Sequence, residues 1–166
     1  PLLKHGITVF IGPGHNGGDG AVIARELFLK GFLVKVWCPF PIKKTLTNNH
    51  LNYLTSIGVT KLVEPPDANG KELWIDAVFG NNQTRKVDNK LIKLFNQKFH
   101  NKYGKVISID IPTGLCPDKG EPFLDNAVKA DYTLAIGLNK IGLTQDSALP
   151  FIGELHHIDV GVPISK

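Results

Sequence analysis

Short apolar runs alternate with amphipathic segments along most of this chain of 166 residues, and this alternation limits the possible folds more than any other feature. The runs are rich in β-branched residues and show no polar alternation, as expected for strands buried on both faces. Strands are predicted over residues 7–11, 32–38, 73–79, 105–110, 132–137 and 154–160, with a short extended piece at 59–63. The pattern predicts a three-layer α/β/α sandwich around a mostly parallel central sheet.

Helices are predicted between these strands. The first spans residues 20–30, the second spans residues 48–57 with Thr47 as its N-cap, and a weak one lies near residues 147–152. Asp88 is expected to cap a further helix, whose apolar positions are Leu91, Leu94, Phe95 and Phe99.

Composition indicates a single domain over residues 1–166. Hydrophobic residues make up 42% and charged residues 20% of the chain, which are ordinary values for a globular protein. The formal net charge of +4 comes from scattered lysines, so we expect a solvated surface and no nucleic-acid partner. No run is long enough to span a bilayer, and no signal peptide is visible. Cys38 and Cys116 stand far apart without metal spacing, which predicts two buried free thiols in a reducing compartment.

Three loops leave the carboxyl ends of predicted strands and carry polar residues: 12–20 (GPGHNGGDG), 76–86 (DAVFGNNQTRK) and 110–115 (DIPTGL). In an open α/β sheet, ligands bind outside these ends, so the loops are expected to form one site. The first loop satisfies G-x-G-x-x-G and suits a phosphate group. A plain dinucleotide-binding dehydrogenase is disfavoured, because no acid for the ribose occurs between Glu26 and Glu64, and a P-loop lacks its Gly-Lys-Ser/Thr.

Two carboxylates, Asp76 and Asp110, stand at or near strand ends, where a charge is costly unless it is paired or ligated. Each could simply cap a loop. Together with the Asn16 amide oxygen and the Thr113 hydroxyl, they favour an oxygen-lined site for a hard cation. His156 and His157 are adjacent in the last strand and therefore point to opposite faces, which favours ordinary surface and packing roles.

The motifs GPGHNGGDG, DAVFG, SIDIPTGL and AVKADYTLAIGLNKIGL, followed by HHIDVGVP, occur in the order seen in the NAD(P)H-hydrate epimerase family, the YjeF N-terminal domain, which this chain resembles. The resemblance implies a Rossmann-like fold and epimerisation of the R and S forms of hydrated NADH and NADPH (NADHX and NADPHX). An ADP- or ATP-dependent dehydratase, fused after residue 166 or separate, would then act on the S form. It further implies a homodimer, a cytoplasmic location and a helical segment that precedes the first strand in relatives.

The resemblance also implies site residues. One potassium ion per subunit would be bound by Asn16, Asp76 and Thr113. The dinucleotide would contact Asp110 and two loop segments, which are His15, Asn16, Gly17, Gly18 and Asp19, and Gly80, Asn81, Asn82, Gln83, Thr84, Arg85 and Lys86. Three positions depart from the family pattern: His15 stands for the usual Asn, Thr113 for the usual Ser, and residues 80–82 lack the bacterial Gly-Thr-Gly.

Chemistry and position make Asp110 the candidate acid/base for the epimerisation. Two other classes remain open at this stage. The first is a non-catalytic nucleotide-binding or interaction module of the same fold, of the kind found in an mRNA-decapping scaffold and in the apolipoprotein A-I-binding protein. The second is another NAD-binding domain, which the missing ribose carboxylate weakens.

Overall fold

The computed structural model describes residues 2–83, 87–138 and 140–161, which form seven strands and four α-helices. In chain order the elements are β1 (Ile7–Ile11), α1 (His15–Leu29), β2 (Val34–Trp37), α2 (Thr45–Ser56), β3 (Thr60–Lys61), β4 (Leu73–Ala77), α3 (Asn89–His100), β5 (Val106–Ile109), β6 (Tyr132–Ile136), α4 (Leu149–Ile152) and β7 (Glu154–Ile158). Short 3-10 turns, η1 (Leu2–His5), η2 (Ile141–Thr144) and η3 (Asp146–Ala148), complete the described part.

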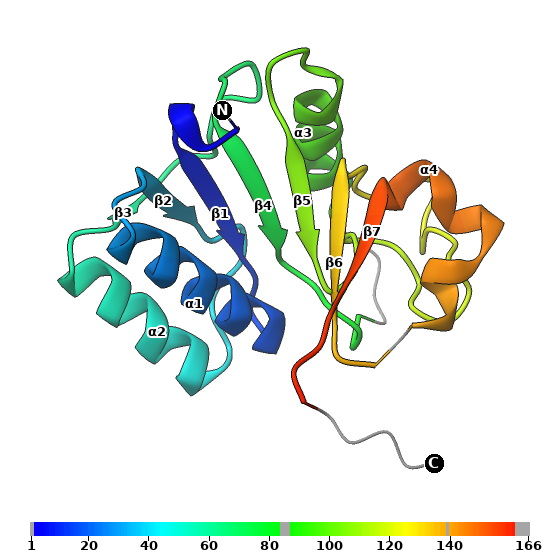
Figure 1. The fold of residues 1–166 in the computed structure, drawn as a ribbon, viewed down its shortest axis with the longest axis horizontal. Helices are drawn as coiled ribbons and strands as arrows, with labels where there is room; N and C mark the ends of the chain where they lie inside the picture. The colour runs from blue at the N-terminus through cyan, green and yellow to red at the C-terminus, as the bar shows by residue number, and fades with distance from the viewer. Residues whose placement is uncertain (1, 84–86, 139, 162–166) are drawn as a thin grey trace.

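The seven strands form one sheet in the order β3-β2-β1-β4-β5-β6-β7, and every pair in it is parallel (Figure 1). The predicted α/β class is therefore confirmed, with a sheet that is parallel throughout its described strands. The chain builds outward from β1 through β2 to β3 and then returns to build from β4 to β7. The strand order reverses between β1 and β4, and a ligand crevice is expected at the carboxyl ends beside this point.

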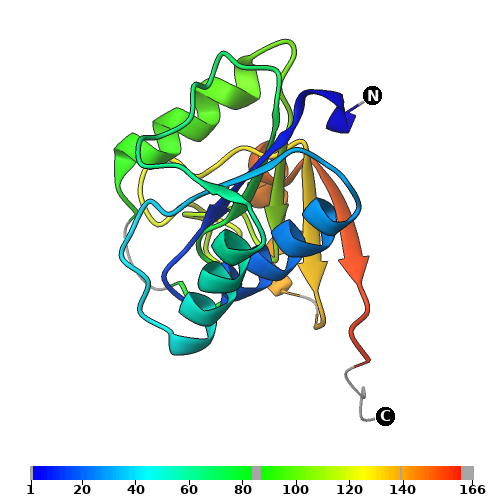
Figure 2. The same cartoon turned by 90° about the vertical axis from the view of Figure 1, so that its left-hand side faces the viewer.

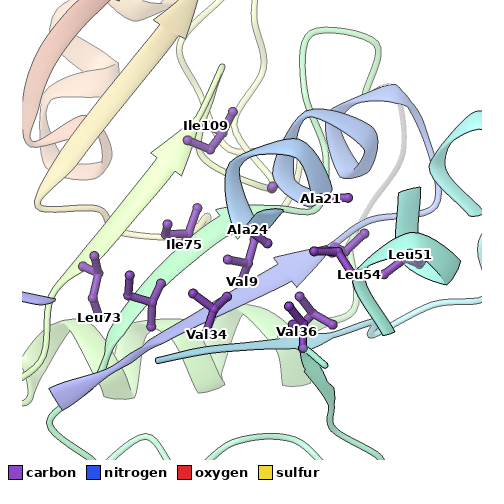
Figure 3. Packing of buried hydrophobic residues seen from close by; sticks show 14 residues of the cluster. Val9, Ala21, Ala24, Val34, Val36, Leu51, Leu54, Leu73, Ile75 and Ile109 are labelled. Atoms are coloured by element: carbon purple, nitrogen blue, oxygen red, sulfur yellow. The ribbon is translucent and has the colours of Figure 1, made fainter. Parts of the chain in front are cut away.

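Helices cover both faces of the sheet (Figures 1 and 2). Helices α1 and α2 pack on one face over a cluster that includes Val9, Val36, Ile75 and Leu54 (Figure 3). The alternate side chains of the same strands, such as Phe10 and Trp74, join α3 in a second cluster on the opposite face. A third cluster lies under α4. Because strands in the middle of the sheet are buried on both faces, their sequences are apolar without alternation, as predicted.

Helix α1 begins at His15, five residues before its predicted start. The glycine-rich segment was predicted to be a loop because glycine disfavours helices. Close packing explains the difference: a Cβ on Gly17 would overlap the carbonyl oxygen of Gly12, and a Cβ on Gly20 would overlap the side chain of Ala77. These glycines let the first turns of α1 lie directly on the β1 loop and on β4.

The second helix also differs from its prediction, because α2 starts at Thr45 and Lys44 occupies the N-cap position. Thr47 lies inside the helix, is buried, and donates a hydrogen bond from Oγ1 to the carbonyl of Gly14 at 2.9 Å. The threonine thus fastens α2 to the loop after β1. The predicted cap of α3 is confirmed, since Asp88 Oδ1 accepts a hydrogen bond from the Lys90 amide at 2.9 Å.

Both cysteines are free, as predicted, but Cys38 and Cys116 are half-buried, where we had expected full burial. His156 and His157 are exposed on β7, and His156 Nε2 lies 3.0 Å from Glu154 Oε1. Within the described ranges, none of the helices has the length and apolar character needed to cross a membrane.

Candidate functional site

A groove runs along the carboxyl edge of the sheet at the point where the strand order reverses. Its centre is a cavity of about 440 Å³ lined by the loops after β1 and β4 and by Asp110. A cavity of about 650 Å³ adjoins it through shared lining residues on the side of Phe40 and Phe79. A cavity of about 550 Å³ adjoins it on the other side, toward the segment between β6 and η2. Asp110 lines both the central cavity and this last one.

Asp76 is the most deeply buried carboxylate of the described site. It lies at the fourth position of β4, with no exposed surface, and no salt bridge reaches it from the described residues. Burial raises the pKa of Asp76, and hydrogen bonds from Thr113, from the Val78 amide and from Ser108 oppose this shift. A buried carboxylate held only by neutral donors is a favourable partner for a cation.

Thr113 is held against Asp76 by two hydrogen bonds. Its hydroxyl donates to Asp76 Oδ1 at 2.7 Å and its amide donates to Asp76 Oδ2 at 2.9 Å. The same hydroxyl oxygen accepts a hydrogen bond from the Phe79 amide at 3.2 Å. The loop after β5 is thereby joined to the loop after β4.

Asn16 contributes an unsatisfied oxygen to the same region. Its Nδ2 donates to the carbonyl of Ile109 at 3.3 Å, which fixes the side chain between α1 and the end of β5. Its Oδ1 is buried and has no hydrogen-bond partner among the described residues. An unpaired buried acceptor is costly, so such a group usually indicates an absent water or ion.

These three side chains fit a monovalent cation. An orphaned amide oxygen, an uncompensated buried carboxylate and a threonine hydroxyl form a hard oxygen donor set with one negative charge. In the described part of the chain, no group of three or more His, Cys, Asp or Glu residues could hold a metal ion, so a site for a softer or multivalent metal is not indicated there.

Asp110 follows β5 in a strained turn. Its φ of 70° makes it the one non-glycine residue with positive φ in the described ranges. The Ile111 amide donates to the carbonyl of Ile109 at 2.9 Å, so Asp110 is the central residue of a γ-turn of the rare positive-φ kind. Such a conformation costs of order 1–3 kcal/mol and is concentrated at functional sites. It turns the chain sharply at the strand end.

Both carboxylate oxygens of Asp110 are engaged. Oδ2 accepts a hydrogen bond from the Asn81 amide at 2.9 Å, and Oδ1 pairs with the Lys140 ammonium. Gly80 makes the approach possible, because a Cβ at this position would lie 2.9 Å from Asp110 Oδ2 and 3.2 Å from the Asn16 Cβ. The loop after β4 therefore packs between the two polar residues at the groove floor.

The structure brings most of the expected dinucleotide contacts to this groove. The central cavity is lined by His15, Asn16, Asp19, Gly80, Asn81, Asn82, Gln83 and Asp110, together with Pro13, Gly14, Lys44, Val78 and Phe79. Gly17 and Gly18 are buried in the first turn of α1 and do not line it. The predicted contacts Thr84, Arg85 and Lys86 lie outside the described residues.

Gln83 has a different environment from the other expected contacts. It is buried, and its Nε2 donates to the carbonyls of Pro112 and Leu115 while its Oε1 accepts from the Gly114 amide. All of its hydrogen bonds go to the backbone of the turn after β5. This residue joins the two loops, even though it also lines the cavity.

Sequence reasoning missed Lys140, whose ammonium pairs with Asp110, and Ser108, whose hydroxyl donates to Asp76 Oδ2 at 3.1 Å. Ser108 stands two residues before Asp110, on the strand next to β4, and could have been inferred from strand pairing. Lys140 lies in the motif AVKADYTLAIGLNKIGL, and its place in that motif was the one signal available.

A family model described as the YjeF-related protein N-terminus matches residues 2–142. The bifunctional NAD(P)H-hydrate repair enzyme Nnr of Gloeobacter violaceus is 40% identical over 157 residues, which cover 93% of this chain and 30% of that protein. The NAD(P)H-hydrate epimerase of Oenococcus oeni is 31% identical over 158 residues, which cover 94% of this chain and 74% of that protein. This chain thus spans less than a third of the bifunctional relative and most of the epimerase.

Among solved structures, the crystal structure of yeast ynu0, YNL200c, superposes with a TM-score of 0.76. The match covers 99% of this chain and 69% of the yeast chain, at 22% sequence identity. At this identity the likeness establishes the fold, which agrees with the predicted Rossmann-like sandwich.

Proposed function

Because the chain belongs to the family of the YjeF-related protein N-terminus, we propose that it epimerises the R and S forms of hydrated NADH and NADPH. The observation that carries this proposal is the position of Asp110. Its carboxyl group stands in a strained turn, is held by donors from two other segments, and lines both the central cavity and its neighbour. A group fixed in this way suits proton transfer to a bound substrate.

The groove supports a dinucleotide as the substrate. Its three adjoining cavities give an elongated site, with the aromatic pair Phe40 and Phe79 at one end and Asp110 toward the other. Lys44 and the N-terminal end of α1 provide positive charge and backbone amides for phosphates. We propose that the hydrated nicotinamide lies against Asp110 and that the phosphates lie over the loop after β1.

We further propose that Asn16, Asp76 and Thr113 hold one potassium ion. The orphaned Asn16 oxygen and the uncompensated Asp76 charge support this assignment. When bound, the ion would supply positive charge that offsets Asp76 and holds the three loops together. It therefore acts on the shape of the site.

The chemistry asked of Asp110 is modest. The substrate is a carbinolamine at C6 of the nicotinamide ring. A protonated Asp110 gives its proton to the leaving hydroxyl, the C6–O bond breaks, and water and a planar nitrogen-stabilised cation result. Water then adds to the opposite face of C6 while the Asp110 carboxylate takes up its proton. The cycle ends with the carboxyl group as it began and the configuration at C6 inverted.

An ADP- or ATP-dependent dehydratase is the proposed partner, since an epimerase supplies such an enzyme with the form that it repairs. Bifunctional relatives of this chain carry repair activity in a longer protein, and others are named as epimerases only, so a fused and a separate dehydratase are both compatible with the family. A homodimer and a cytoplasmic location are further proposals from the family resemblance.

The test is a coupled assay. The chain is added to a mixture of R and S hydrates after an S-specific dehydratase has consumed the S form. We expect the remaining R hydrate to be consumed faster than by uncatalysed epimerisation. NADP binding without any catalysed rate would contradict the enzyme proposal and would favour a non-catalytic nucleotide-binding module.

A further inference from the structure

Lys140 has an unusual position for a lysine. It follows β6 and is the N-cap residue of η2, and its side chain is only 8% exposed. Lysine is almost never buried unless it is paired. Its ammonium donates to the carbonyl of Ile136 at 2.6 Å and pairs with Asp110 Oδ1. The residue is therefore fixed at the end of β6 and directed at the candidate acid/base.

The two donors to Asp110 come from different parts of the fold. The Asn81 amide belongs to the loop after β4 and approaches Oδ2, whereas Lys140 belongs to the segment after β6 and approaches Oδ1. The carboxylate, itself 14% exposed, is thus clamped from both sides of β5. Asp19 of α1 also lines both cavities with Asp110 and is close enough to raise its own pKa through the Asp110 charge.

A clamp of this kind has a specific consequence for the proposed reaction. The γ-turn at Asp110 fixes the backbone but leaves the carboxyl group free to rotate about its side-chain bonds. Lys140 removes that freedom. It also faces the negative charge that remains on Asp110 once the proton has gone to the leaving hydroxyl, so it stabilises the state in which the ring is a cation.

We propose that Lys140 is a positioning residue that fixes the Asp110 carboxylate for the epimerisation. This inference rests on the proposed function. The alternative is a purely structural role, in which the lysine joins η2 to the end of β6. The two roles differ in whether the effect of Lys140 passes through Asp110.

The first measurement is the epimerase rate of Lys140→Met, which keeps most of the aliphatic stem and removes the ammonium. We expect kcat to fall about 10- to 100-fold with KM within about twofold of wild type, because misplacement of a catalytic group affects the chemical step. Lys140→Arg keeps the charge and should recover much of the loss. The matched control is Lys93→Met, at an exposed lysine of α3 far along the chain from the groove loops, and it should match wild type.

The second measurement is a double-mutant cycle with Asp110→Asn. If Lys140 acts through the carboxylate, adding Lys140→Met to Asp110→Asn should lower the rate by less than about twofold further. An equal loss in both backgrounds would overturn the proposal, and so would a wild-type kcat in Lys140→Met.

The third measurement needs no activity. The NMR resonance of the Asn81 amide proton reports its hydrogen bond to Asp110 Oδ2. It should shift in Lys140→Met and stay in place in Lys93→Met. An unchanged Asn81 resonance in Lys140→Met would contradict the clamp even if the wild-type chain proved to have no epimerase activity, which would refute the proposed function separately. If Lys140→Met does not fold, Lys140→Gln is used in all three measurements with the same expectations.

Discussion

Thr113 binds both oxygens of Asp76: its hydroxyl donates to Oδ1 at 2.7 Å and its amide donates to Oδ2 at 2.9 Å. The two residues are 37 positions apart and lie on neighbouring strand ends, so this contact joins the loops after β4 and β5. All the described donors to Asp76 are neutral. The carboxylate is held in place without being neutralised, which leaves an energetic advantage for any cation that reaches it.

Potassium should stabilise the fold. If the ion binds the native chain alone, the free energy of unfolding rises by about 2.7 kcal/mol when its concentration is a hundred times its Kd. Urea unfolding in potassium chloride is compared with unfolding in tetramethylammonium chloride at the same ionic strength. Equal stability in the two salts would contradict the ion site.

The stabilisation by potassium should also depend on pH. Burial raises the pKa of Asp76 above the ordinary value of 3.8, so the folded chain binds the proton more tightly than the unfolded chain. Without potassium, this group makes stability fall as pH rises from 3.8 through the raised pKa. Proton and potassium compete for the carboxylate, so the gain from potassium should be larger at pH 8 than at pH 5. A larger gain at pH 5 would contradict the assignment of Asp76.

Thr113→Val should destabilise the fold by about 1–3 kcal/mol, because it leaves the Asp76 carboxylate and the Phe79 amide each without one buried hydrogen-bond partner. Thr113→Ser keeps the hydroxyl and should remain closer to wild type. Thr133→Val, which removes a buried hydrogen bond to the Ile152 carbonyl, is the control for general loss of a buried hydroxyl. Potassium dependence should weaken in Thr113→Val and persist in Thr133→Val.

Gly80→Ala should lower the epimerase rate more than it lowers stability. The new methyl group would meet Asp110 Oδ2 at 2.9 Å, and the carboxylate must move away to relieve the contact. We expect kcat to fall by about tenfold or more through this displacement. Rate and unfolding measurements on the same preparation check the expectation, and an unchanged kcat would show that the Asp110 geometry is not critical.

His15→Asn should remove a pH dependence of NADP affinity. His15 is exposed at the start of α1 and lines the central cavity, where phosphates are proposed to bind. An imidazole gains positive charge between pH 8 and pH 5. NADP should therefore bind the wild-type chain more tightly at pH 5.5 than at pH 8, and the variant should show a smaller change. Identical pH profiles would mean that His15 faces away from the ligand.

The sheet was readily predicted because buried parallel strands leave a local signature, and Asp88 was recognised as a cap because capping is a local interaction. The start of α1 was not, since glycines that disfavour a helix are required there by packing against Gly12 and Ala77. Only the folded chain shows that contact.

The candidate site shows the same division. Polar residues at strand ends identified Asn16, Asp76, Asp110 and Thr113 as a group. The pairing of Lys140 with Asp110 depends on where a segment 30 residues later in the chain turns after β6. The positive φ of Asp110 also has no local signal, because glycine is the residue that usually marks it.

The most direct test of the account is the epimerase rate of Asp110→Asn in the coupled assay, with the uncatalysed rate subtracted. The variant keeps the shape of the side chain but cannot exchange a proton. We expect normal folding, retained NADP binding, and a catalysed rate about 10²-fold or more below wild type. A folded variant that binds NADP and epimerises at the wild-type rate would contradict the assignment of Asp110 as the acid/base.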